Sequence, residues 1–228
     1  MKNLLIVMAW ELKLQIRYHI VTIAALVTAI YAAVFYFLPL KEYEKLLITL
    51  IFSDPAMLGF LFVGVLVLFE KGANTLKALV VTPLKPDTYL WAKAFSLTLI
   101  AIPAGLIMAI TGYGWFFNYG WLLLGIIYAS FLALFVGFIG VFRIRTLNQY
   151  LMIIPFFLTP LTFPLLNLFN VTDTLLFYLI PTQASLLLFE AAFNGFSHVG
   201  EQIYAIFYPL LWIGILFFLS KKSFIKYS

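Results

Sequence analysis

The residues best suited to bind a partner or to react lie in one polar stretch, residues 69–87, between two long apolar runs. The stretch contains three lysines, a glutamate, an aspartate, a glycine and two prolines. A short helix is predicted to end before Pro83, because the residue preceding a proline disfavours the α region. An amphipathic helix can seat in a groove of another protein. Spacing alone leaves two interpretations, a docking surface or a connection whose lysines only set orientation. The apolar face would consist of Thr75, Leu76, Leu79 and Val80.

The sequence lacks the motifs of common enzyme chemistries. It has no G-x-x-x-x-G-K-[ST] phosphate loop, and its one Lys-Ser pair, Lys222-Ser223, has no accompanying glycines. It has no H-E-x-x-H and no G-x-S-x-G, and His19 and His198 are far apart. It contains no cysteine, which excludes disulfides and thiolate metal sites. We therefore predict no catalytic residue, no metal site and no cofactor in this chain.

The composition indicates a membrane protein. Hydrophobic residues make up 64% of the chain and charged residues only 10%, whereas a soluble domain has about 25% charged residues. Several apolar runs approach the roughly 20 residues that a helix needs to cross a bilayer. They lack the strict alternation of barrel strands, and backbone groups in hydrocarbon must be paired internally. The predicted class is an all-α polytopic membrane protein.

Six transmembrane helices and an amphipathic N-terminal helix are predicted. Residues 1–19 are expected to lie in the membrane interface, with Trp10, Lys13 and Arg17 near the headgroups. The alternative is a basic flank that only orients the first span. The approximate spans are residues 20–40, 55–69, 89–110, 121–142, 149–166 and 203–220.

Two charged residues at the span boundaries have specific predicted roles. Asp54 precedes Pro55 and is interpreted as the N-cap of a helix beginning at about Pro55. The alternative for Asp54 is a charged group within a span, which can mark a transport pathway. Lys93 lies in the first turn of the third span, from which it can extend to the interface.

The basic residues favour cytoplasmic termini. The formal net charge is +5, and the basic residues flank apolar runs, which favours a topological role over nucleic-acid binding. With six spans, all 14 basic residues except Lys41 and Lys45 lie inside. A seventh span at residues 174–193 would place the basic C-terminus outside. Residues 170–200 are therefore predicted to be a re-entrant or surface helical segment on the outer side. Candidate outer gate elements are Pro155, Pro160, Pro164 and Pro181.

The pattern of residues 69–93 resembles the permease subunits of ABC exporters of the type-2 class. The matching residues lie at the spacing of the family signature, and the order of spans extends the resemblance over essentially the whole chain. Asn74 and Ala92 stand where glycine is usual, and asparagine also tolerates a left-handed turn. Residues 51–55, 69–72 and 180–183 are similar to the fluoroquinolone-type export permease branch. The signature residues are Glu70, Thr75-Leu76, Leu79, Thr82-Pro83-Leu84 and Lys93.

This resemblance implies a function and several partners. Residues 70–87 would form a cytoplasmic coupling segment that engages a separate ABC ATPase subunit, which binds ATP and Mg²⁺. A second permease copy, identical or paralogous, would complete the transporter in the cell membrane. The dimer interface would carry a drug-like, lipid-like or other amphipathic substrate outward, along spans two and five. The coupling residues would be Glu70, Lys71, Gly72, Thr75, Leu76, Leu79, Thr82, Pro83 and Lys85.

Two other function classes compete with the exporter. A self-contained channel or secondary carrier would usually place ionisable residues within spans or show inverted repeats. The sequence shows almost no charge within its spans and no clear repeat. A membrane scaffold subunit without transport activity is the third class. ATP-independent flux would identify a carrier, and an absence of flux with any partner would identify a scaffold.

Overall fold

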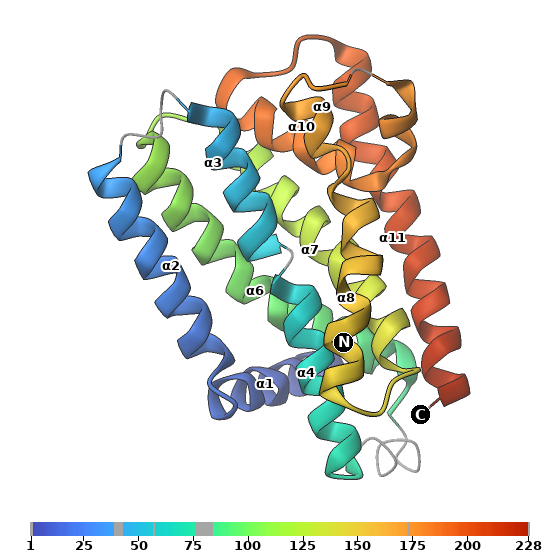
Figure 1. Cartoon of the computed structure of the whole chain (residues 1–228). Helices are drawn as coiled ribbons and strands as arrows, with labels where there is room; N and C mark the ends of the chain where they lie inside the picture. Colours follow the sequence, from blue (N-terminus) through green and yellow to red (C-terminus); the bar gives the residue numbers. More distant parts are fainter. Residues whose placement is uncertain (1, 39–42, 57, 76–83, 173, 228) are drawn as a thin grey trace.

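The chain folds into long helices that pack side by side, with one helix lying across their ends (Figure 1). The computed structural model describes residues 2–38, 43–56, 58–75, 84–172 and 174–227. Within these ranges the secondary structure is helical and contains no strand. The first half comprises α1 (Lys2–Arg17), α2 (Ile20–Phe37), α3 (Glu44–Ile51), the π-helix η2 (Phe52–Ala56) and α4 (Leu58–Gly72). The second half comprises α6 (Pro86–Tyr113), α7 (Tyr119–Val141), α8 (Leu147–Thr162), α9 (Leu165–Leu168), the 3₁₀ helix η3 (Leu175–Leu179), α10 (Pro181–Asn194) and α11 (Val199–Tyr227).

Five of the described segments are long and apolar enough to cross a membrane. They are α2, the run Glu44–Gly72, α6, α7 and α11. The prediction of an all-helical, multi-pass protein is therefore confirmed. The predicted fifth span corresponds to α8, whose 16 residues are shorter than the roughly 20 that a straight crossing needs. The six-span layout stays a prediction.

Helix α7 forms the centre of the protein. It packs against α4, α6, α10 and α11, and large side chains such as Phe135 and Phe138 are fully buried along it. Helix α2 is different, because only Ile20, Ala24, Thr28 and Phe35 are buried in it. A helix that is apolar on all sides and exposed on most of them is suited to contact lipid or another membrane subunit.

The second apolar run differs from its prediction at Asp54. Instead of capping a new helix, Asp54 lies inside the π-helix η2, which continues from α3. Pro55 belongs to the same π-helix, and α4 begins at Leu58. The candidate span that contains Asp54 starts at Glu44, whereas the span was predicted to start at residue 55. Leu47, Ile48 and Ile51 are buried and hold α3 against the other helices. The charged group therefore lies well within the run.

Two of the three prolines in the fifth apolar run lie within a helix. Pro155 and Pro160 lie inside α8 and are exposed, whereas the helix ends just before Pro164, which is buried. Helix α8 is attached to α4 through Tyr150, which donates a hydrogen bond to the carbonyl oxygen of Phe60 at 2.6 Å. A Cβ atom added to Gly64 would lie 2.0 Å from the nearest atom of the Tyr150 ring. Only glycine at this position permits so close a contact.

The segment predicted on the outer side contains a buried helix. Pro181 occupies the first turn of α10 and is buried, as expected for a proline at a helix start. The Thr182 hydroxyl donates to the carbonyl oxygen of Leu161 at 2.6 Å and ties α10 to the end of α8. Helix α10 packs on α7 and α11 at the end of the bundle opposite α1 (Figure 1). Whether the segment enters the membrane and whether its prolines act as gate elements stay predictions.

Candidate functional site around Lys93

The site begins with the orientation of α1. This helix lies across the end of the bundle, beside α6 (Figure 1). Its buried positions are polar: Glu11 is 4% exposed and Gln15 is fully buried. Trp10, Lys13 and Arg17 are exposed, so the residues predicted to face the interface are available to do so. Helix α1 therefore directs a polar pair inward, one helical turn apart.

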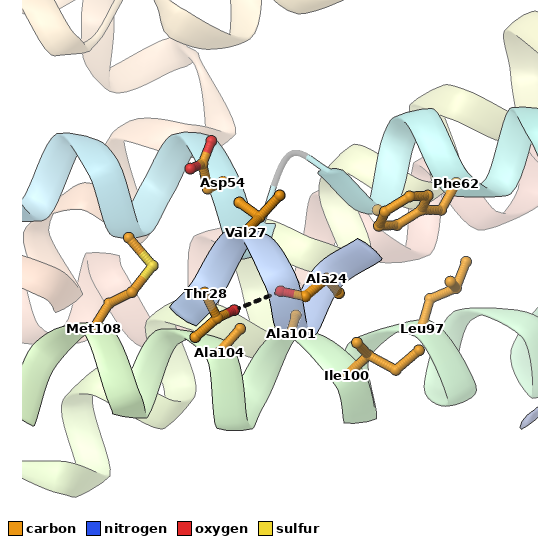
Figure 2. A pocket seen from close by; sticks show the side chains of 11 residues that line it. Ala24, Val27, Thr28, Asp54, Phe62, Leu97, Ile100, Ala101, Ala104 and Met108 are labelled. Atoms are coloured by element: carbon orange, nitrogen blue, oxygen red, sulfur yellow. Dashed lines mark hydrogen bonds between the residues drawn. The ribbon is translucent and has the colours of Figure 1, made fainter. Parts of the chain in front are cut away.

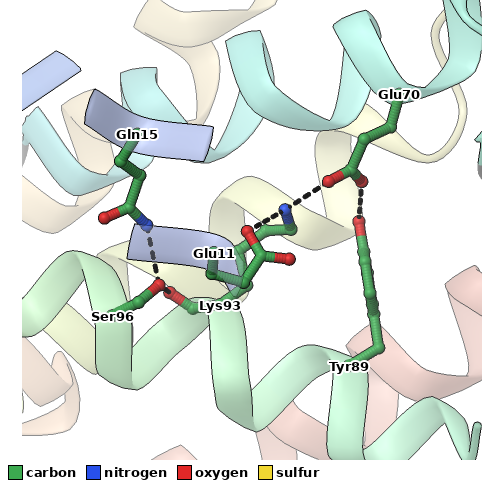
Figure 3. A network of polar contacts seen from close by, with 6 residues as sticks. All are labelled: Glu11, Gln15, Glu70, Tyr89, Lys93 and Ser96. Carbon is green, nitrogen blue, oxygen red and sulfur yellow. Dashed lines mark hydrogen bonds and ion pairs between the residues drawn. The ribbon is translucent and has the colours of Figure 1, made fainter. Parts of the chain in front are cut away.

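Helix α6 supplies the matching face. Pro86 occupies its first turn, where a missing N–H costs no helical hydrogen bond. Tyr89, Lys93 and Ser96 follow at spacings of four and three residues, which places them on one side of the helix. All three are buried. They face α1 and the last turn of α4, which carries Glu70 (Figure 3).

A buried charge network joins α1, α4 and α6. The Lys93 Nζ atom lies 2.7 Å from Glu11 Oε2 and 2.6 Å from Glu70 Oε1. The Tyr89 hydroxyl donates to Glu70 Oε2 at 2.5 Å. Beside the ion pairs, Gln15 Nε2 donates to Ser96 Oγ at 2.7 Å. Figure 3 shows the ammonium group between the two carboxylates.

The surroundings of Lys93 correct the prediction that it extends to the interface. Its side chain is fully buried, and its charge is balanced by carboxylates from two other helices. A buried charge is tolerated only when it is paired and hydrogen-bonded. Burial raises the pKa of Glu11 above its ordinary value of 4.5, Lys93 opposes this shift, and the charge of Glu70 adds to it. The network is therefore a tightly interdependent unit.

Lys71 fastens the end of α4 to the end of α7. Its Nζ atom donates to the carbonyl oxygens of Val141, Phe142 and Ile144 at 3.2, 2.7 and 3.0 Å. These carbonyl groups lie at a helix C-terminus, where backbone acceptors lack helical partners and the helix dipole favours a cation. Lys71 thus has a structural role here, and its ammonium group faces the protein.

The predicted coupling residues fall into three groups. Glu70 and Lys71 are engaged in the contacts above and do not offer their charges to a docking partner. Gly72, Thr75 and Lys85 are exposed at the two ends of the polar segment. Asn74 has a φ of 55°, a left-handed conformation that asparagine tolerates. Leu76, Leu79, Thr82 and Pro83 lie outside the described residues, and with them the predicted short helix.

The start of α6 is held by a second ion pair. Lys221 Nζ of α11 lies 2.8 Å from Asp87 Oδ1 and donates to Oδ2 at 3.0 Å. Asp87 lies in the first turn of α6, where a negative charge is favourable to the helix dipole. The end of α4 is therefore bonded to α6 and α7, and through Lys93 to α1, while the start of α6 is bonded to α11.

The sequence signals for this network were present but weak. Glu11 and Gln15 are spaced by one turn in a helix that is otherwise apolar and basic, and Tyr89, Lys93 and Ser96 share one face. None of the predicted roles fell on Glu11, Gln15, Tyr89 or Ser96. Their pairing depends on how α1 crosses α6, and residues 11 and 93 are 82 positions apart. Helical periodicity cannot specify such a contact.

Comparison with known proteins identifies similar sequences. The sequence profile of the family described as "Fluoroquinolones export permease protein family" matches residues 2–228. The chain is 31% identical over 220 residues to the fluoroquinolones export permease protein of Mycobacterium tuberculosis strain CDC 1551 / Oshkosh. The alignment covers 95% of this chain and 92% of the relative. The protein of the same name from strain ATCC 25618 / H37Rv matches with the same identity and coverage.

Proposed function

The chain belongs to the fluoroquinolones export permease protein family, and from this membership we propose that it is the membrane-spanning subunit of an ATP-driven drug exporter. Family membership and the apolar helices make it a multi-pass membrane permease. The proposal adds a partner ATPase that binds ATP and Mg²⁺, since the sequence carries no phosphate loop. Its cargo would be a fluoroquinolone-like or other amphipathic drug moved out of the cytoplasm.

The anchoring of the polar segment is the observation that supports ATPase coupling. An engaged ATPase would push on residues 72–85, whose two ends are fixed by the Lys93 network and by Lys71. A rigid junction at this point would transmit the displacement to α1, α6 and α7 instead of absorbing it in a loose loop. The proposed docking residues are Gly72, Thr75, Leu76, Leu79, Thr82, Pro83 and Lys85, with Glu70 and Lys71 positioning the segment.

The proposed orientation places this end of the bundle in the cytoplasm. The helix α1 and the end of α11 lie at the same end of the bundle as the polar segment (Figure 1). The basic residues of this end favour the cytoplasmic side. A second copy, identical or paralogous, would pack against the exposed helix faces, with the substrate route at the dimer interface along spans two and five. The largely exposed α2 and α8 provide apolar surface for lipid or that copy.

Binding of the ATPase can be tested with two matched triple variants. Thr75, Leu76 and Leu79 changed together to Asp should abolish co-purification with the co-expressed ATPase subunit, because charge would replace the apolar docking face. Val171, Leu175 and Leu176, which are exposed at the opposite end, changed together to Asp should leave the complex intact. Complex formation and ATP-dependent transport by the first variant at the level of the unmodified chain would refute the docking assignment.

A secondary carrier is the second candidate, and Asp54 is the observation that favours it. This carboxylate lies within an apolar run long enough to cross the membrane, and such residues often mark ion-coupled pathways. Reconstitution in liposomes separates the candidates. Substrate flux by the purified chain alone, without ATPase or ATP, would establish the carrier. Flux that requires both would support the exporter.

A further inference from the structure

Asp54 carries an acceptor that the protein leaves without a partner. Tyr31 of α2 lies close to the Asp54 carboxylate. Its Oδ2 atom is buried and accepts no hydrogen bond from any residue that the structure describes. A carboxylate at membrane depth is costly unless a cation or several donors balance it. The π-helix that carries Asp54 is itself a feature found frequently at functional sites.

Asp54 lies at the edge of a narrow cavity between α2, η2, α4 and α6. Apart from Asp54 and Thr28, its walls are apolar. Figure 2 shows Asp54 across from Ala101 and Ala104 of α6, and the Thr28 hydroxyl directed at the Ala24 carbonyl oxygen at 2.8 Å. The cavity volume is about 20 Å³, which accommodates a group the size of one water molecule. A primary ammonium group meets this limit, whereas a trimethylammonium group does not.

A larger apolar groove lies beside this cavity. It has a volume of about 550 Å³ between α1, α2 and α6, within the range of small-molecule binding sites. The groove begins beside Leu12 and Ile16 of α1 and runs along Pro103 of α6. The groove and the inner cavity adjoin at the contact between α2 and α6, because Ala24, Thr28, Ile100 and Ala104 line both.

From this juxtaposition we propose that the groove between α2 and α6 binds a cationic amphiphile within a single subunit, with its primary ammonium group on Asp54. The apolar body fills the groove, and the ammonium group supplies the missing partner of Oδ2. A neutral acyl chain would satisfy the groove but not the carboxylate. Export of the bound molecule rests on the proposed function. Binding itself does not depend on an ATPase.

The site can be tested by photolabelling of the purified chain in nanodiscs. The probes are a diazirine-bearing dodecylammonium and the alcohol of the same chain length, and labelled peptides are mapped by mass spectrometry. The ammonium probe should label α2 and α6 about tenfold more strongly than the alcohol, the factor expected for a hydrogen bond to a charged group. Asp54→Asn should reduce ammonium labelling to the level of the alcohol. Glu201→Gln, the same charge change on α11 outside the groove, should not.

Three further arms keep the result interpretable. Ala104→Phe fills the groove and should reduce labelling by both probes, and the trimethylated probe should label less than the primary ammonium. Asp54→Glu retains the charge and should keep a preference for the ammonium probe. Labelling of Asp54→Asn by the alcohol, together with its melting temperature, verifies that this variant is folded.

The outcomes for binding and for export can be separated. Equal labelling by the ammonium and alcohol probes, or unchanged ammonium labelling in folded Asp54→Asn, would overturn the proposed site. Either result would leave the exporter proposal intact if ATP-dependent flux persists. Conversely, charge-selective labelling without ATP-dependent flux would support the site and refute the exporter.

Discussion

Replacing Lys93 with methionine removes the cation that holds three helices together, and its cost can be worked out from the geometry. The two ion pairs at 2.7 and 2.6 Å each have a gross Coulomb energy of about 6 kcal/mol at an effective dielectric constant of about 20. Desolvation of the ions offsets much of this energy in the intact protein. In Lys93→Met, Glu11 and Glu70 keep that penalty without compensation, so the free energy of unfolding should fall by about 3–5 kcal/mol.

The assay is thermal unfolding of the purified chain in detergent. For a chain of this size each kcal/mol shifts the melting temperature by about 2–4 °C, so Lys93→Met should melt about 6–20 °C lower. Lys85→Met is the matched control, because Lys85 is exposed and surface substitutions usually change stability by less than about 0.5 kcal/mol.

A compensated variant distinguishes charge from packing. Lys93→Met combined with Glu11→Gln and Glu70→Gln leaves no charge in the network. It should recover more than half of the lost melting temperature, because the main cost of the single variant is its unbalanced carboxylates. The electrostatic reasoning fails if Lys93→Met melts within 1 °C or so of the unmodified chain, or if the compensated variant melts as low as the single one.

Three further predictions follow from the same contacts. The pKa of Glu11 is raised in the folded chain, so the native state retains a proton that the unfolded state loses, and stability should decline as pH rises above about 4.5. The melting temperature of Glu11→Gln should therefore decline less between pH 4.5 and pH 8 than that of the unmodified chain. Equal declines in the two proteins would contradict this prediction. Gly64→Val should displace Tyr150, because a Cβ atom would lie 2.0 Å from the Tyr150 ring. The free energy of unfolding should fall by about 1–3 kcal/mol, measured as a lower melting temperature. An unchanged melting temperature would show that α8 can move freely. Lys71→Met should lose the three hydrogen bonds to the end of α7, which should lower the free energy of unfolding by about 1–3 kcal/mol. Trypsin should then cut faster at the two arginines that follow α7, and an unchanged cleavage rate would refute the capping role.

The family pattern was accessible from the sequence because it consists of local features. Apolar runs near the length of a bilayer crossing predicted a multi-pass helical protein, and the helical structure and the family confirm this. The spacing of polar residues between 69 and 93 resembled an export permease, and the comparisons confirm the family. The left-handed turn at Asn74 was also predictable, because asparagine tolerates positive φ.

The errors arose where a residue's environment comes from distant parts of the chain. Lys93 was expected at the interface because lysines near span ends usually extend to it, yet carboxylates from α1 and α4 balance its charge in a buried position. Asp54 was expected to cap a helix because it precedes a proline, yet α3 continues into η2 and carries it into the apolar run. In both cases a sound local rule was overridden by packing.

The sequence by itself determined the class of protein and the location of the polar segment, since hydropathy and spacing are properties of neighbouring residues. Only the tertiary structure decided which charges are buried. Glu11 meets Lys93 across 82 positions because α1 crosses α6 at that point, and Asp54 meets an apolar cavity because α2 and α6 enclose it. The energy of a charge depends on the partners and the dielectric around it, and both are set by helix packing.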